Sequence, residues 1–145
     1  MNTVSRGGYN ADYYMSWDEF DKEIRALAQK IDYAPDVIVG VVRGGLVPAR
    51  LLSSLLKVPQ MRCITLERVG ERKILDELQG DFMGKKMLVV EDMIETGKGL
   101  VAAKKYLESK GALVKTACLY IMPISETKPD YFLREVAEVV KFPWE

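Results

Sequence analysis

The sequence contains no histidine and only two cysteines among its 145 residues. Without histidine, the chain cannot form a Ser–His–Asp triad, a histidine metal site or the usual general base of neutral pH. Cys63 and Cys118 each lie in an apolar, strand-like run, which predicts buried, reduced thiols of a cytosolic protein. Chemistry on this chain must therefore use carboxylates, Lys, Arg, Tyr, backbone amides or a metal ion bound by oxygen atoms.

An excess of charge and a long apolar run are absent as well. The 21 Lys and Arg residues balance the 21 Asp and Glu residues, which argues against nucleic-acid or membrane binding as the main activity. No apolar run approaches the roughly 20 residues of a membrane span, and the N-terminus lacks the apolar core of a secretion signal. We therefore expect one cytoplasmic domain over residues 1–145, in which residues 1–15 form a polar N-terminal arm.

Helical patterns alternate with apolar runs along the chain. A capping box begins at Ser16 and opens a helix, whose core-facing side we expect to comprise Trp17, Phe20, Ile24, Leu27 and Ile31. Strands are expected at residues 37–42, 61–66, 87–90 and 114–121. The alternation predicts an α/β fold, with a mostly parallel twisted sheet and helices on both faces.

The connecting segments give weaker signals. The glycine turn at residues 43–45 precedes a second helix, and a third helix runs from the turn at residues 96–99 to about Lys110, where Gly111 ends it. The charged stretch 67–86 predicts a mobile loop with a short helical patch. Residues 131–140 predict a short helical or strand segment.

The strongest functional signal lies at residues 88–100, which read LVVEDMIETGKGL. Glu91 and Asp92 follow a buried strand, and a Thr-Gly-Lys-Gly turn then opens a helix. Ligands of α/β sheets bind at the carboxyl ends of the strands, and free amides at a helix N-terminus bind phosphate. A Walker A loop would need Gly at Asp92 and Ser or Thr at Gly99, so the pattern is not one. Two acids beside a phosphate-binding turn predict a ligand with hydroxyl groups and a phosphate, such as a ribose phosphate.

This stretch resembles the phosphoribosyl-pyrophosphate binding motif of the type I phosphoribosyltransferases. From about Trp17 onward the chain is similar to the small xanthine-guanine enzymes of that family, including residues 42–48 (VRGGLVP) and 142–145 (FPWE). The resemblance implies a core sheet of about five strands with a small C-terminal hood. It also implies Mg²⁺-dependent purine salvage, in which phosphoribosyl pyrophosphate and guanine, xanthine or hypoxanthine give a nucleotide and pyrophosphate. A homodimer or homotetramer that binds neither membrane nor nucleic acid would be typical.

The resemblance also implies roles for individual residues. Glu91 and Asp92 would bind the ribose hydroxyls, with Asp92 the metal residue, and Glu95 would be the catalytic proton carrier. Arg72 would belong to a loop that closes over the transition state. The residues implied to bind ribose and phosphates are Arg43, Gly44, Arg72, Glu91, Asp92, Met93, Ile94, Glu95, Thr96, Gly97, Lys98 and Gly99, and those implied to bind the base are Glu95, Val139 and Val140.

The base half of the site departs from the family pattern. Glu95 replaces an Asp, Met122 replaces a Lys that donates to the 6-oxo group, and Val139 replaces a stacking Trp, whereas Trp144 is expected to anchor the core or an interface. Loss of the charged donor should weaken discrimination between oxo- and aminopurines. Two other functions therefore stay open: a nucleotide-sensing regulator without catalysis, and a transferase for a non-purine acceptor.

Overall fold

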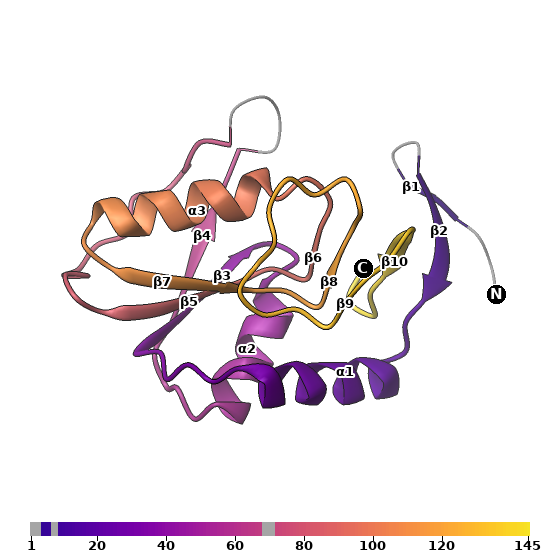
Figure 1. The fold of residues 1–145 in the computed structure, drawn as a ribbon, viewed down its shortest axis with the longest axis horizontal. Helices are drawn as coiled ribbons and strands as arrows, with labels where there is room; N and C mark the ends of the chain where they lie inside the picture. The colour runs from indigo at the N-terminus through magenta and orange to yellow at the C-terminus, as the bar shows by residue number, and fades with distance from the viewer. Residues whose placement is uncertain (1–3, 7–8, 68–71) are drawn as a thin grey trace.

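A computed structural model describes residues 4–6, 9–67 and 72–145 of the chain. Its central sheet is parallel, in the order β4-β3-β5-β7. The strands are β3 (Val37–Val42), β4 (Met61–Thr65), β5 (Lys86–Val90) and β7 (Leu113–Ala117). Helix α3 (Lys98–Ser109) covers one face, and α1 (Trp17–Lys30) and α2 (Leu46–Leu55) cover the other (Figure 1). The predicted α/β class with a parallel sheet between helices is confirmed.

The sheet is buried on both faces, so its strands read as unbroken apolar runs. In β5, Met87 and Val89 join the core cluster under α3, whereas Leu88 and Val90 join the cluster under α1 and α2. All four side chains are fully buried. This double burial fixes the register of β5 and hence the position of the acidic pair that follows it.

Two small sheets flank the central one. Strands β6 (Met93–Ile94), β8 (Tyr120–Ile121) and β9 (Arg134–Glu135) are parallel to one another. In the other small sheet, β2 (Tyr9–Tyr14) pairs antiparallel with β1 (Val4–Arg6) and parallel with β10 (Val139–Lys141). The N-terminal arm therefore contains two strands and lies beside the C-terminal hood (Figure 1). Among the described residues the central sheet has four strands, close to the number that the resemblance implied. The run over 114–121, expected as one strand, forms β7 in the central sheet and β8 in a small one.

Helix α1 begins at the predicted cap. The Ser16 hydroxyl accepts a hydrogen bond from the Glu19 amide at 3.1 Å, and the side chains of Phe20, Ile24 and Leu27 are buried. Trp17 was expected on the same buried side, but 56% of it is exposed. It lies in the first turn, where its ring contacts the edge of the core through Phe20 and Trp144, with centroids 6.1 Å apart in both pairs.

The segment that follows β4 differs from its prediction. No helix occurs in its described part, residues 72–85, so the predicted helical patch is wrong there. The Leu75 amide donates to the Thr65 carbonyl at 2.9 Å, which aligns the segment with the end of β4. Leu78 and Phe82 are buried in the core cluster under α3, so apolar anchors and not helical hydrogen bonds position these residues. Residues 68–71 of the predicted mobile loop lie outside the described residues.

The two cysteines have different environments. Cys118 is buried, as predicted, whereas Cys63 is exposed and that prediction is wrong. Cys63 lies on β4, an edge strand of the central sheet, which has a neighbouring strand of that sheet on one side only. In the part of the chain that the structure describes, no helix is both long enough and apolar enough to span a bilayer.

Candidate active site

A cavity of about 800 Å³ opens where β3 and β5 end at their carboxyl sides. Its walls come from the turn after β3, the acidic pair Glu91 and Asp92, the predicted phosphate loop (residues 95–99), the segment after β4, and the C-terminal turn (residues 142–145). Every residue predicted to bind ribose and phosphates lines this cavity except Lys98, whose side chain is exposed. The lining residues are Val41, Val42, Arg43, Gly44, Leu66, Glu67, Arg72, Glu91, Asp92, Met93, Ile94, Glu95, Thr96, Gly97, Gly99, Leu100, Lys141, Trp144 and Glu145.

The backbone around the acidic pair is fixed by hydrogen bonds to the neighbouring strand. The Glu91 amide donates to the Ala117 carbonyl at 3.0 Å, and the Leu119 amide donates to the Asp92 carbonyl at 2.9 Å. The Asp92 carboxylate accepts a 2.6 Å hydrogen bond from the Met93 amide. Burial raises the pKa of Asp92 to about 6, and repulsion from Glu145 adds to the shift. A cation or hydroxyl donors in the cavity would therefore stabilise the ionised form of Asp92.

The turn after β3 packs directly on this carboxylate. A Cβ atom at Gly44 would lie 2.5 Å from Asp92 Oδ2 and 2.8 Å from Oδ1. At Gly45 a Cβ atom would lie 2.2 Å from the Val90 carbonyl oxygen. The peptide bond between Val42 and Arg43 is cis. A side chain at Gly45 would therefore collide with backbone atoms of β3 and β5, whereas a side chain at Gly44 would displace the Asp92 carboxylate.

The phosphate loop joins the acidic pair to α3. Gly97 caps the helix with a φ of +85°, in the left-handed region that glycine adopts without strain. A Cβ atom there would also lie 2.4 Å from the Thr127 methyl carbon. The Glu126 amide donates to the Thr96 carbonyl at 3.1 Å, so the loop after β8 supports the turn. Gly97 and Gly99 line the cavity at a helix N-terminus, where the first amides have no helical partner and suit a phosphate group.

Acidic side chains outnumber basic ones around the cavity. Five carboxylates (Glu67, Glu91, Asp92, Glu95 and Glu145) face three cations (Arg43, Arg72 and Lys141). Oxygen donors of this kind fit Mg²⁺, which retains most of its water and takes few protein ligands. Within the described ranges, no three His, Cys, Asp or Glu side chains gather closely enough to form a metal cage. Any Mg²⁺ here would therefore rely on oxygens of the ligand and on Asp92 or Glu91.

The C-terminal turn supplies a wall that sequence reasoning did not place. Lys141, Trp144 and Glu145 line the cavity, although the resemblance included residues 142–145. The Trp144 ring stacks on Phe142 with centroids 4.9 Å apart and meets Phe20 edge-on at 4.8 Å. The expected core packing of Trp144 is confirmed, and its place in the cavity wall is additional. Proximity of this turn to Asp92 depends on tertiary packing, so no local signal could have identified it.

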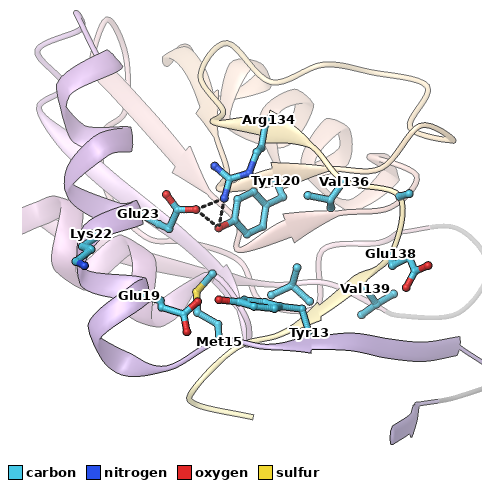
Figure 2. A pocket seen from close by; sticks show the side chains of 12 residues that line it. Tyr13, Met15, Glu19, Lys22, Glu23, Tyr120, Arg134, Val136, Glu138 and Val139 are labelled. Atoms are coloured by element: carbon cyan, nitrogen blue, oxygen red, sulfur yellow. Dashed lines mark hydrogen bonds and ion pairs between the residues drawn. The ribbon is translucent and has the colours of Figure 1, made fainter. Parts of the chain in front are cut away.

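The structure does not bring Val139 and Val140 into this cavity. Their side chains line a second cavity of about 700 Å³ between α1, the N-terminal arm and the hood (Figure 2). In its wall, the Tyr120 hydroxyl donates to Glu23 at 2.5 Å, and Arg134 pairs with the same carboxylate oxygen. Burial and this hydrogen bond raise the pKa of Tyr120. A base in the first cavity could meet Val139 and Val140 only through their backbone.

Comparisons with known proteins agree with this geometry. The phosphoribosyl transferase domain family matches residues 14–145. The xanthine-guanine phosphoribosyltransferase of Idiomarina loihiensis is 28% identical over 146 residues, which cover 94% of this chain and 88% of the relative. A purine phosphoribosyltransferase structure from Pyrococcus horikoshii is 36% identical, with a TM-score of 0.84 and coverage of 92% of this chain and 93% of that one. A xanthine-guanine-hypoxanthine phosphoribosyltransferase structure from Helicobacter pylori is 26% identical, with a TM-score of 0.80 and 92% coverage of both chains. The chain therefore belongs to the phosphoribosyltransferase family, has the type I fold and is similar to the xanthine-guanine members.

Proposed function

We propose that the protein transfers a phosphoribosyl group from phosphoribosyl pyrophosphate to a purine base with Mg²⁺, producing a nucleotide and pyrophosphate. One observation carries this proposal: a single cavity contains the acidic pair, the glycine turn after β3 and the N-terminus of α3. These three features match, in order, the ribose hydroxyls, the pyrophosphate and the 5′-phosphate of one donor molecule.

The acidic pair would orient the ribose and stabilise positive charge at its anomeric carbon. Glu91 and Asp92 accept hydrogen bonds from the ribose hydroxyls, and their negative charge favours the oxocarbenium-like transition state. Arg43 and Arg72 meet the departing pyrophosphate, which also approaches the backbone at Gly44. Because carboxylates exceed cations in this cavity, a polyanionic donor needs a counter-charge. Mg²⁺ supplies it when bound together with the donor.

Glu95 is the proposed proton carrier. It lines the cavity between the acidic pair and the phosphate loop, so its carboxylate can reach a base attached at the anomeric carbon. As general base it accepts the ring proton that the purine nitrogen loses when the new bond forms. Its extra methylene relative to Asp lengthens its reach without changing that chemistry.

A nucleotide-sensing regulator is the second candidate. It is favoured by the base half of the site, because Met122 is buried and lines neither cavity, and Val139 faces the second cavity. A non-purine acceptor is compatible with the same observation. The basic residue Arg72 in the cavity wall favours catalysis over sensing, since a sensor has no transition state to shield.

A base panel tests the proposal. Pyrophosphate release is measured with phosphoribosyl pyrophosphate and Mg²⁺ against guanine, xanthine, hypoxanthine, adenine, uracil and orotate. We expect turnover of an oxopurine that falls by roughly 100-fold or more in Glu95→Ala and persists in Glu108→Ala, an exposed α3 control. Donor binding, followed by calorimetry, should survive in Glu95→Ala. Tight nucleotide binding with no turnover would favour the sensor, and turnover of uracil or orotate alone would favour a non-purine acceptor.

A further inference from the structure

Lys141 is the cation of the C-terminal wall of the active-site cavity. It is the last residue of β10, and its backbone is held in register with Tyr14 of the N-terminal arm. The Met15 amide donates to the Lys141 carbonyl at 2.9 Å, and the Lys141 ammonium lies over the Tyr14 ring, 5.4 Å from its centroid. Two backbone contacts and one aromatic ring therefore fix the stem of a half-buried lysine.

The side chain of Lys141 lies on a wall of the active-site cavity, where a bound ligand can reach its ammonium group. The ammonium group lies over the face of the Tyr14 ring, which attracts a cation but carries no opposite charge. A half-buried cation at a cavity wall is stabilised when a ligand presents an oxygen or a negative charge. The C-terminal wall of the cavity therefore offers a positive group to a ligand.

The position of Lys141 indicates which part of the ligand it meets. The acidic pair and the phosphate loop follow β5, and Arg43 and Gly44 follow β3, so the ribose, the 5′-phosphate and the pyrophosphate are assigned to those walls. The base extends from the anomeric carbon away from the phosphates, which leaves the C-terminal wall of Lys141 and Trp144 for it. Met122, where the family has a base-reading cation, is a buried apolar side chain.

We propose that Lys141 determines base specificity by donating to an oxygen of the base, and that it favours xanthine relative to guanine. This inference rests on the proposed function. Xanthine carries a carbonyl oxygen at both the 2- and the 6-position of its ring, and it loses a ring proton close to neutral pH. An ammonium group therefore stabilises it both by a hydrogen bond to an oxygen and by attraction to the negative charge. Guanine presents an amino group at one of those positions, and a lysine donor gains nothing from it.

The test compares kcat/KM for xanthine and guanine in the full-length wild type, Lys141→Gln, Lys141→Arg and the control Lys105→Gln. Lys105 is exposed on α3 and lies outside the cavity lining. In Lys141→Gln we expect the xanthine-to-guanine ratio to fall roughly tenfold or more, through KM for xanthine, with KM for phosphoribosyl pyrophosphate unchanged. Lys141→Arg should restore part of the ratio, and the control should match the wild type. Melting curves verify that each variant is folded.

Three results would overturn the inference. An unchanged ratio in folded Lys141→Gln means that the lysine does not read the base. An equal loss with every base, together with a raised KM for phosphoribosyl pyrophosphate, assigns Lys141 to the pyrophosphate. Wild-type protein that releases no pyrophosphate with any purine overturns the proposed function and this inference with it, whereas turnover with an unaltered ratio overturns the inference alone.

Discussion

The substitution Gly44→Ala should impair catalysis without destabilising the fold. The added methyl group would stand 2.5 Å from Asp92 Oδ2, 2.7 Å from Cγ and 2.8 Å from Oδ1. Ordinary contact begins near 3.4 Å, so the carboxylate or the turn must move by 3.4 − 2.5, about 0.9 Å. The carboxylate is the end of a side chain and can move, although this weakens the hydrogen bond that it accepts from the Met93 amide. The Asp92 backbone stays in place, because its carbonyl accepts from the Leu119 amide.

A displacement of about 1 Å in a positioned catalytic group can reduce a rate by about 100-fold. For Gly44→Ala we therefore expect kcat/KM for pyrophosphate release to fall by that factor, which corresponds to about 2.7 kcal/mol of transition-state stabilisation. The melting temperature should change little, because the clash is relieved at the cavity surface. Steady-state kinetics and thermal melting on the same preparation measure both quantities.

Gly45→Ala provides the contrast, since its methyl group would lie 2.2 Å from the Val90 carbonyl oxygen and 2.8 Å from the Val41 backbone nitrogen. Backbone atoms of two central strands cannot yield as a side chain can, so this neighbouring substitution should lower the melting temperature. Wild-type kcat/KM in Gly44→Ala would refute the reasoning. A melting temperature as low as that of Gly45→Ala would refute it too, because the turn would then be structural and not part of the site.

Two further predictions concern stability. Burial raises the pKa of Asp92 to about 6, whereas in the unfolded chain the same carboxyl group loses its proton near pH 4. Between these two pH values the folded protein therefore binds the extra proton, and the free energy of unfolding falls as pH rises from about 4 to about 6. Asp92→Asn should remove that loss of stability, which raises the free energy of unfolding at pH 8 by at most about 3 kcal/mol, and it should abolish turnover. Urea unfolding of both proteins from pH 4 to pH 8 measures the effect. A stability difference from wild type that does not change with pH would contradict the prediction. Ser16→Ala removes the hydroxyl that accepts a hydrogen bond from the Glu19 amide. It should lower the free energy of unfolding by about 1 kcal/mol and leave kcat/KM unchanged. Chemical denaturation measures the loss, and an unfolding midpoint identical to that of the wild type would show that the cap contributes nothing.

Local features of this chain were readable from its residues. Strand β3 covers residues 37–42 as its apolar run predicts, and α1 starts at the Ser16 cap. Gly111, with a φ of +91°, follows α3 at the predicted place. Such features depend on neighbours a few positions away, because hydrophobic period, capping and glycine conformation are properties of the local backbone. The acidic pair was identified for the same reason, since it directly follows a strand.

Features that depend on distant segments were not readable in this way. Cys63 is exposed because β4 is an edge strand, and Trp17 is exposed although its helical spacing matches that of buried residues. Lys141 and Asp92 are far apart in the chain, and they share a cavity because the C-terminal turn packs on α1, where the Trp144 ring meets Phe20 edge-on. A residue pattern records which side chains avoid water, but not which of the surfaces so formed will meet. For this protein the proposed ribose-phosphate half of the site lies within one continuous stretch and the turn beside it, whereas the wall proposed to face the base forms only when the C-terminal segment packs against the rest of the fold.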